Sequence, residues 1–254
     1  MNIGFTNFGD LDKDAIAWAN RCPTKPSGDY LFKLSNFIKS LKSNGTWWKI
    51  DLLQIYATEF QDNATTAIIG VDPTLVSTPT FTRLLGITTN GSSNYINTNF
   101  ANNTSVYRTQ NLGGFGYYTR TNLNNTNFDA AANTTTGNVD SIRPNSAGSF
   151  IYAVNATQFT LTGGGQSGPA LFAGIRTNST TMTAYKNDTL INTRTQNSTA
   201  LINRAMFVGA RNNNGTAANF IAKQFSMYFN AGFDGTEYVD FYNSFDKFRL
   251  QVGF

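Results

Sequence analysis

Carboxylates are almost the only side chains in this sequence that could carry out chemistry. The chain has no histidine and a single cysteine, Cys22. This composition excludes the Ser–His–Asp and Cys–His nucleophile systems, the commonest metal ligand and any zinc site built from cysteines. A single cysteine also excludes an internal disulfide.

The carboxylates are spaced too widely to predict a hydrolase. Hydrolysis of a glycoside needs two carboxyl groups about 5–10 Å apart. Sandwich enzymes usually place them at alternate positions of one strand, where they share a face. Glu59 and Glu237 flank a long central region whose acids, Asp129, Asp140 and Asp188, include no pair at i,i+2. We therefore expect a non-enzymatic protein without catalytic residues.

A glycine-rich segment matches the spacing of a dinucleotide-binding loop. Residues 163–168 fit G-x-G-x-x-G, and Asp188 lies twenty residues further on. The motif works where a helix N-terminus follows and holds the pyrophosphate. Here Pro169 follows, and then residues 170–175 have the pattern of a strand. We interpret the segment as a flexible hairpin loop and expect no cofactor.

Calcium is the metal for which the sequence leaves an alternative open. Jelly-roll domains can hold calcium with a few loop oxygens. Asp188, or Asp129 together with Asp140, could supply such oxygens. A single acid in a turn is more typical of a turn former than of a ligand, so no metal site is assigned.

Aromatic residues are the candidates for carbohydrate binding. Sugar-binding surfaces combine aromatic faces with polar hydrogen-bonding groups, and the candidates are Tyr117, Tyr118, Trp47 and Trp48. Because neighbouring residues of a strand point to opposite faces, one member of each pair is expected to face the core. The sequence does not decide which member is exposed, so the ligand-binding residues stay unassigned.

The composition favours a β-rich fold with a neutral polar surface. Charged residues make up 13% of the chain, against roughly a quarter in ordinary soluble domains. Asn, Thr, Ser and Gly take their place, while 21 Phe and 11 Tyr favour strands and supply a core. The net charge is +4, but the basic residues are scattered singly, which argues against nucleic acid as a partner.

Targeting segments are not recognisable in the sequence. No window is apolar enough for a membrane span, and the N-terminus lacks the basic and apolar regions of a secretory signal. We expect synthesis in a cytoplasm and no membrane insertion.

The N-terminal part of the chain, residues 1–45, predicts two short helices. The first runs through Trp18 and is capped by Asp10 or Asp12. The second is capped by Ser27 or Asp29. Its apolar residues recur at intervals of three and four, and a glycine stands where the helix should end; these positions are Tyr30, Leu34, Phe37, Ile38, Leu41 and Gly45.

The remainder, residues 46–254, predicts strands and one further helix. Short apolar runs separated by turns are expected to be strands; they are 47–56, 81–87, 150–154, 158–161, 170–175, 182–185, 189–191, 205–209 and 220–229. Residues 186–188 are a hairpin turn signal. Strands at this spacing, without long helices between them, predict an antiparallel two-sheet jelly-roll sandwich on which residues 1–45 pack.

The C-terminus predicts a helix over residues 235–250. Asp234 and Glu237 form a capping box. The aromatic residues that follow fall on one helix face; they are Tyr238, Phe241, Tyr242, Phe245 and Phe248. Such a stripe is either a cofactor surface or a packing surface, and we expect it to pack against the sandwich.

Several segments in a fixed order carry a family resemblance. They are 17–21, 37–42 and 45–51 near the start, 95–100, 185–188 and 207–212 in the middle, and 225–253 at the end. In this order they resemble a phage-associated concanavalin A-like, laminin-G-like jelly-roll family over nearly the whole chain. Asp188 departs from the family pattern, since it replaces the glycine of a Y-x-N-G hairpin.

The resemblance implies a non-enzymatic structural protein of a virion, because members of this family are mostly virion or tail-associated proteins of bacteriophages, many from phages of Bacteroidetes. Such a protein is a capsid decoration, a head fibre or a tail attachment component, made in the host cytoplasm. Its implied partners are other virion proteins, further copies of itself in a homo-oligomer, and host cell-surface glycans. The alternative is a lectin-like carbohydrate-binding module of a bacterial or viral surface protein.

Overall fold

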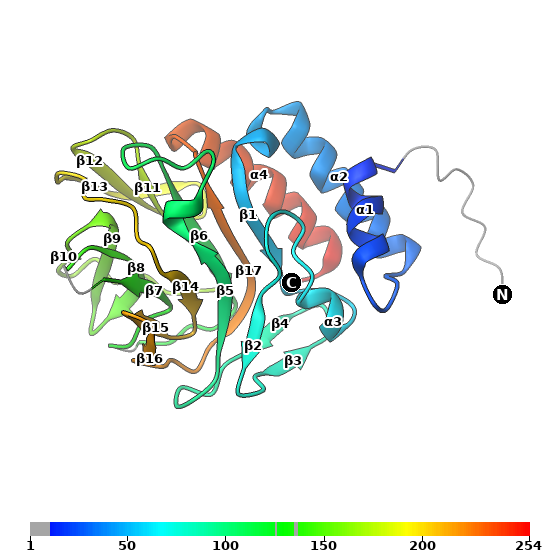
Figure 1. Cartoon of the computed structure of the whole chain (residues 1–254), viewed down its shortest axis with the longest axis horizontal. Helices are drawn as coiled ribbons and strands as arrows, with labels where there is room; N and C mark the ends of the chain where they lie inside the picture. Colours follow the sequence, from blue (N-terminus) through cyan, green and yellow to red (C-terminus); the bar gives the residue numbers. More distant parts are fainter. Residues whose placement is uncertain (1–10, 125, 135–136) are drawn as a thin grey trace.

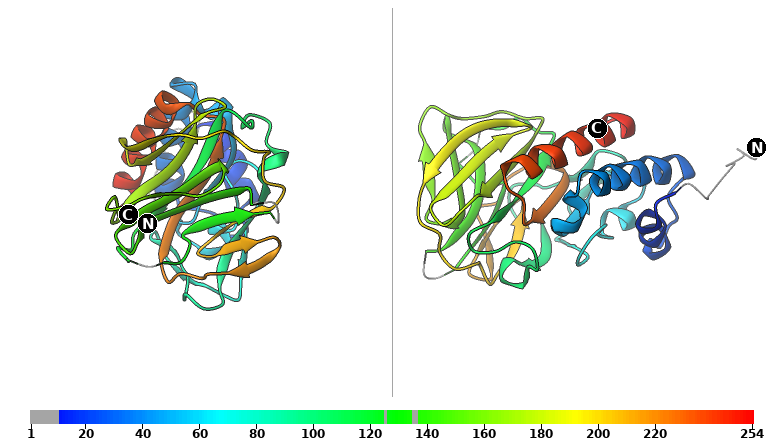
Figure 2. Two further views of the ribbon diagram at one scale, coloured as in Figure 1. Left: turned by 90° about the vertical axis from the view of Figure 1, so that its left-hand side faces the viewer. Right: turned by 90° about the horizontal axis from the view of Figure 1, so that it is seen from above.

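Two stacked sheets and a layer of helices make up the part of the chain that the structure describes. A computed structural model describes residues 11–124, 126–134 and 137–254. In these residues two sheets lie face to face, and helices cover the other face of one of them (Figures 1 and 2). The prediction of a mainly β, antiparallel two-sheet sandwich is therefore confirmed.

The helix-covered sheet joins strands that are far apart in sequence. Its order is β13-β12-β11-β6-β17-β4-β3, and β1 also pairs with β17. These strands are β1 (Ile50–Ile55), β3 (Thr80–Thr82), β4 (Gly86–Thr88), β6 (Gly113–Thr119), β11 (Ala170–Arg176), β12 (Thr181–Lys186), β13 (Thr189–Thr195) and β17 (Gln224–Ala231). The adjacent β12 and β13 confirm the hairpin predicted at residues 186–188.

The second sheet has the order β10-β9-β8-β7-β14-β5-β2, with β15 and β16 attached at β7. Its strands are β2 (Thr74–Val76), β5 (Tyr95–Ala101), β7 (Ala130–Asn133), β8 (Val139–Ser146), β9 (Ser149–Ala156), β10 (Phe159–Leu161), β14 (Ala205–Val208), β15 (Arg211–Asn213) and β16 (Thr216–Ala218). All described pairings in both sheets are antiparallel except that of β15 with β7.

An aromatic and aliphatic core fills the space between the sheets. Phe172 of β11 lies 6.3 Å from Phe150 of β9 and 6.2 Å from Tyr117 of β6, measured between ring centroids. All three side chains are fully buried. Contacts of this kind join the two sheets into one sandwich.

Local side-chain caps start the helices near the N-terminus. The carboxylate of Asp12 accepts a hydrogen bond from Asp14 N at 2.9 Å and begins α1 (Lys13–Arg21). Ser27 accepts one from Tyr30 N and begins α2 (Gly28–Ser43). Ser27 rather than Asp29 is therefore the cap, and the alternative cap Asp10 lies outside the described residues.

The C-terminal helix is capped as predicted. Asp234 and Glu237 form the reciprocal capping box at the start of α4 (Gly235–Val252). Three shorter helical turns complete the described set: η2 (Thr46–Lys49), α3 (Gln61–Ala64) and η3 (Asn102–Thr104). None of the helices in the described ranges combines the length and the apolar character needed to cross a membrane.

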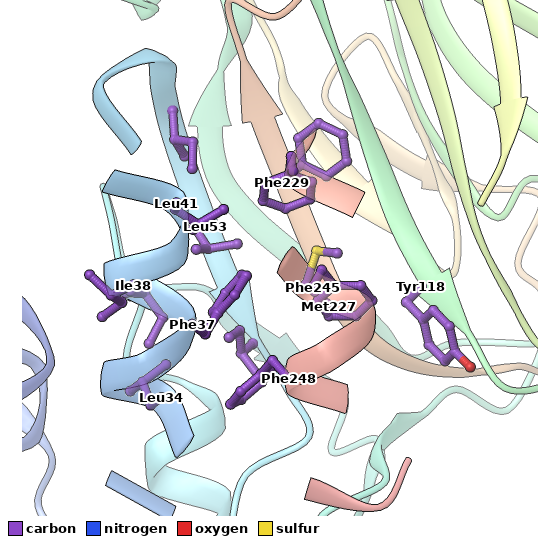
Figure 3. Packing of buried hydrophobic residues seen from close by; sticks show 14 of the residues in the cluster. Leu34, Phe37, Ile38, Leu41, Leu53, Tyr118, Met227, Phe229, Phe245 and Phe248 are labelled. Carbon is purple, nitrogen blue, oxygen red and sulfur yellow. The ribbon is translucent and has the colours of Figure 1, made fainter. Parts of the chain in front are cut away.

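Aromatic rings hold the helical layer onto the sheet. Phe37 of α2 stacks on Phe248 of α4 at 5.0 Å (Figure 3). Phe229 of β17 lies 4.7 Å from Phe241 of α4. The aromatic stripe of α4 is therefore a packing surface, as predicted. Its residues and the apolar residues of α2 belong to one buried cluster.

Strands under the helical layer are buried on both faces. Every residue of β1, β6 and β11 is buried, because one face meets the other sheet and the opposite face meets the helices. Such strands need no alternation of apolar and polar residues.

Three predicted strands begin or divide differently in the structure. The predicted strand 47–56 starts only at Ile50, because Gly45 adopts a left-handed conformation (φ +82°) and directs the chain into the 3-10 turn η2. The predicted strand 81–87 is a hairpin of β3 and β4, whose connection contains Leu84 at φ +59°. The predicted strand 220–229 begins at Gln224.

The glycine segment 163–168 is not a hairpin loop. It connects β10 of the second sheet to β11 of the helix-covered sheet, so it crosses between the sheets. Gly165 N donates to Gly148 O at 2.9 Å, and Gln166 N donates to Pro144 O at 2.7 Å. A strand follows this segment, as expected, which excludes the helix that a dinucleotide-binding loop requires.

Truncation of Phe37 is expected to destabilise the fold. Phe37 is 3% exposed and contacts three aromatic rings of α4, so Phe37→Ala should lower the free energy of unfolding by about 3–5 kcal/mol in denaturant titrations. Phe32→Ala is the matched control, since Phe32 lies on the same helix and is 48% exposed. Its effect should stay within about 0.5 kcal/mol. Equal effects of the two variants would contradict the packing role of the helical layer.

Candidate functional site

A buried ion pair occupies Asp140, one of the acids that the sequence offers for chemistry. Arg108 Nη2 donates to both carboxylate oxygens at 2.9 Å, and both side chains are fully buried. The backbone N–H of Asn155 donates to the same carboxylate at 2.8 Å, and the Asn102 amide donates to it as well. These bonds engage Asp140 in the interior, where it serves the fold.

Asp129 is engaged in the same manner by a different cation. Lys223 Nζ lies 2.6 Å from Asp129 Oδ2, and the two side chains are 3% and 2% exposed. Burial raises the pKa of Asp129, while the Lys223 ammonium acts in the opposite direction. Arg108 on Asp140 and Lys223 on Asp129 thus engage the two acids that the sequence offers together as calcium ligands.

The three remaining candidate acids are Asp188, Glu59 and Glu237, and each has a different environment. Asp188 is exposed in the turn between β12 and β13. Glu59 accepts a hydrogen bond from Ser27 N and forms an ion pair with Arg83 at 3.3 Å. Glu237 serves in the capping box and pairs with Lys49. The described residues include no group of three or more His, Cys, Asp or Glu side chains that could hold a metal ion.

The two aromatic pairs that the sequence offers as candidates for sugar binding differ in exposure. Trp47 is 8% exposed and Trp48 is 57% exposed, so one member of this pair faces the core as expected. Tyr117 and Tyr118 are both buried. Tyr117 lies between the sheets, and Tyr118 lies beneath α4, 5.6 Å from the ring of Phe245. The tyrosine pair therefore provides no binding surface, because both faces of its strand are covered.

A cleft of about 360 Å³ opens beside Trp48, where the helical layer meets the sheet. Its walls come from α1, from η2 and the start of β1, and from two loops; the lining residues are Asp14, Ala17, Trp18, Arg21, Trp47, Trp48, Ile50, Ile68, Ile69 and Tyr107. We call this hollow the Trp48–Tyr107 cleft. Its volume is within the range of small-molecule sites, about 300–1,000 Å³.

Two exposed aromatic residues from distant parts of the sequence line this cleft. Trp48 is 57% exposed and Tyr107 is 44% exposed, whereas most aromatic side chains in the described part of the chain are buried. Exposed aromatic rings in a hollow offer flat apolar surface to a ligand. The neighbouring Val106 is also exposed and extends the apolar character of this loop.

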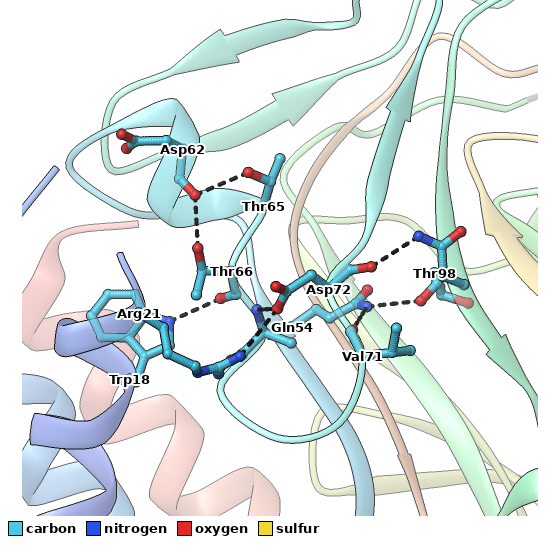
Figure 4. A network of polar contacts seen from close by, with 11 residues as sticks. Trp18, Arg21, Gln54, Asp62, Thr65, Thr66, Val71, Asp72 and Thr98 are labelled. Atoms are coloured by element: carbon cyan, nitrogen blue, oxygen red, sulfur yellow. Dashed lines mark hydrogen bonds and ion pairs between the residues drawn. The ribbon is translucent and has the colours of Figure 1, made fainter. Parts of the chain in front are cut away.

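The polar groups of the cleft come from α1. Asp14 and Arg21 are seven residues apart, which places them on the same side of the helix. Arg21 Nη1 lies 3.4 Å from Asp72 Oδ1 (Figure 4), and Arg21 Nη2 also donates to the carbonyl of Ala67. A guanidinium has five N–H groups, so further donors are left for a ligand.

Hydrogen bonds fix α1 to the chain segment behind it. Trp18 Nε1 donates to Thr66 O at 2.8 Å (Figure 4). Ala67 N donates to Asp72 Oδ1 at 2.8 Å. Gln54 of β1 donates from its amide to Val71 O and Thr98 O, at 3.0 Å in each case. The polar wall of the cleft is thus attached to the sandwich.

A single carboxylate holds the loop that carries Tyr107. Asp51 of β1 accepts hydrogen bonds from three consecutive backbone N–H groups: Val106 at 2.6 Å, Tyr107 at 2.9 Å and Arg108 at 2.8 Å. The side chain of Arg108 extends inward to Asp140. The loop is therefore anchored at its backbone and by a buried side chain, which leaves Tyr107 directed outward on a fixed support.

Gly232 joins the two segments that carry the aromatic residues. Its N–H donates to Lys49 O at 2.8 Å, next to Trp48 in sequence. A Cβ atom at Gly232 would lie 2.4 Å from Tyr107 O, so glycine is needed for the close approach of this loop. Gly232 thus lies against both segments, the one that carries Trp48 and the one that carries Tyr107.

A second hollow lies around Phe60. It is lined by Thr24, Phe60, Gln61, Asp62 and Thr65 and measures about 520 Å³. Phe60 is its one aromatic lining residue, and the Asp62 carboxylate already accepts hydrogen bonds from Thr24 N and Oγ1. The Trp48–Tyr107 cleft has aromatic side chains on two walls and is the stronger candidate site.

Among the residues of this candidate site, the sequence offered Trp47 and Trp48 as an undecided pair and gave no indication of Tyr107, Arg21, Asp14 or Asp51. The only local signal for Tyr107 is an apolar pair, Val106-Tyr107, within a stretch rich in Asn, Thr and Gly. Asp51 has no local signal, since its role depends on N–H groups more than fifty residues away in sequence.

Asp51→Asn is expected to loosen the loop around Tyr107. The amide keeps one acceptor oxygen and turns N–H groups toward three donors, so the free energy of unfolding should fall by about 1–3 kcal/mol. Hydrogen exchange at the amides of residues 106–108 should accelerate. Asp188→Asn is the matched control, since Asp188 is exposed in a turn, and it should leave both measurements unchanged. Unchanged exchange in Asp51→Asn would contradict the anchoring role.

Cys22 is expected to be chemically inert in the folded protein. The thiol is 1% exposed, and burial raises its pKa to about 11, so it stays protonated at pH 8. A disulfide reagent such as DTNB should therefore react with Cys22 slowly in buffer and rapidly in guanidinium chloride. Equally fast reaction in both would show that Cys22 is accessible in the native state.

Comparisons with known proteins find structural likeness without sequence likeness. No protein-family model and no curated protein matches the chain. The structure is similar to domain 4 of AbnA, a GH43 extracellular arabinanase from Geobacillus stearothermophilus, with a TM-score of 0.50 and 11% identity over 76% of this chain and 98% of that one. A Trypanosoma rangeli sialidase mutant gives 0.49 and 10%, over 86% of this chain and 40% of that one.

A third similarity is to the CBM40 of the Ruminococcus gnavus IT-sialidase, with a TM-score of 0.40 and 14% identity over 52% of this chain and 82% of that one. At these identities the likeness concerns the fold alone. The chain is thus a two-sheet sandwich that shares its fold with domain 4 of the arabinanase.

Proposed function

We propose that this chain is a non-enzymatic carbohydrate-binding module that holds its ligand in the Trp48–Tyr107 cleft. The observation that carries the proposal is the convergence of two exposed aromatic side chains and two charged side chains in one hollow. Sugar rings have apolar C–H faces and a rim of hydroxyl groups. Aromatic rings match the first, and carboxylate and guanidinium groups match the second.

The support beneath the cleft favours binding. Tyr107 is held through the backbone by Asp51, and α1 is held by the hydrogen bond from Trp18 to Thr66 O and by the ion pair of Arg21 with Asp72. A preorganised surface loses little conformational entropy when a ligand binds. The similarity in fold to an arabinanase domain solved in complex with arabinotriose supports the proposal by analogy.

The surroundings of the central acids support a role without catalysis. A glycosidase requires one carboxyl group as the acid and a second as the base or nucleophile. Here the Asp129 and Asp140 carboxylates are each engaged by a buried cation, away from the residues that line the cleft. We expect no release of reducing sugar when the protein is incubated with a polysaccharide that it binds. Sustained release by purified protein would contradict this part of the proposal.

The setting that we propose is the surface of a bacteriophage virion, as a capsid or tail component with further copies of itself and other virion proteins as partners. The support for this setting is the order of sequence segments that resembles the phage-associated jelly-roll family. Mass spectrometry of purified particles should detect the chain as a stoichiometric component. Its absence from intact particles would refute the virion setting, while the proposal of a carbohydrate-binding module would stand.

Trp48→Ala is expected to weaken carbohydrate binding by about 10-fold or more, because it removes the largest exposed aromatic surface of the cleft. Binding is measured on a polysaccharide array and then by calorimetry with the best ligand. Phe60→Ala is the matched control, since Phe60 is 39% exposed and lies in the second hollow. Loss of binding in Phe60→Ala with retention in Trp48→Ala would move the site to that hollow.

A further inference from the structure

The charges around the Trp48–Tyr107 cleft are already paired. Lys42 Nζ lies 2.6 Å from Asp14 Oδ2 and 2.6 Å from Asp12 Oδ1, so one ammonium group serves two carboxylates. Arg21, the cation that lines the cleft, lies 3.4 Å from Asp72 Oδ1. Three carboxylates therefore face two cations in this group of residues.

This arrangement opposes a negatively charged ligand. An anionic group on a ligand would have to compete with Asp72 for Arg21 and would approach the Asp14 carboxylate, which is 34% exposed. Two like charges about 4 Å apart near a protein surface repel each other by several times the thermal energy. An uncharged ligand avoids this repulsion and leaves both ion pairs in place.

The same groups are suited to hydroxyl groups. A carboxylate in an ion pair still has lone pairs for a hydroxyl donor, and a guanidinium that makes two bonds still has N–H groups for a hydroxyl acceptor. Asp14 and Arg21 thus offer one acceptor and one donor on the same helix face, in the cleft that Trp48 and Tyr107 also line. Hydroxyl groups, which both donate and accept, can satisfy the two residues together.

We propose that the Trp48–Tyr107 cleft selects uncharged saccharides over acidic ones, with Asp14 and Arg21 as its hydrogen-bonding residues. The inference rests on the proposed carbohydrate-binding function and deepens it by naming the ligand class. It also predicts a weak dependence on salt, because a neutral ligand gains no long-range attraction that counterions could screen.

The test is an array of neutral polysaccharides (arabinan, galactan, xylan and mannan) and acidic ones (polygalacturonate, alginate and polysialic acid), probed at low and moderate sodium chloride. Binding should be confined to neutral polysaccharides and should change by less than about 2-fold between the two salt concentrations. Preferential binding of an acidic polysaccharide that still requires Trp48 would overturn the selectivity while leaving the carbohydrate-binding function intact. Binding to no polysaccharide would overturn the function itself and the selectivity with it.

A variant at Asp14 tests its hydrogen-bonding role, provided that the variant protein still folds. Asp14→Asn should weaken binding of the best neutral ligand by about 5- to 10-fold, because an amide accepts hydroxyl hydrogen bonds less strongly than a carboxylate. Asp29→Asn is the matched control, since Asp29 also lies in the first turn of a helix but outside the cleft. Thermal unfolding of both variants verifies folding. Unchanged affinity in a folded Asp14→Asn protein would refute the hydrogen-bonding role of Asp14.

Discussion

The burial of the central strands of one sheet on both faces is the constraint on which this structure depends. Aromatic side chains of α2 and α4 cover the side of β6, β11 and β17 that faces away from the second sheet. Phe229, which contacts both Phe233 and Phe241, shows how closely the strand and the helix are joined. Most large apolar side chains of the described residues lie either in this layer or in the core between the two sheets.

This constraint determines where a binding surface can form. Tyr117 and Tyr118 belong to a strand with no free face, so both rings serve as core. The aromatic side chains that stay exposed near a hollow lie where the helical layer ends and loops from the sandwich meet it. Trp48 and Tyr107 lie at this seam, with Asp51 and Gly232 holding their segments together.

Buried charges have a structural role in the sandwich. Arg108 links the loop beside the cleft to Asp140 in the second sheet, and Lys223 links Asp129 to the segment before β17. A buried ion pair costs desolvation and contributes little net stability, but it penalises arrangements in which either charge is left alone. In this protein the Arg108 pair fixes the position of a loop, and through that loop it contributes to the shape of the cleft.

The sequence by itself determined the features that depend on neighbouring residues. The cap Asp234, the stripe of α4 and the hairpin at residues 186–188 follow from contacts within a few positions, and for each N-terminal helix the sequence left two candidate caps. The tertiary structure decided which strands lie under the helices, that Trp47 and Trp48 form a turn, and that Asp51 meets residues 106–108. The physical reason is that burial on two faces removes the alternation that marks a strand face, and hydrogen bonds between distant segments leave no periodic signal.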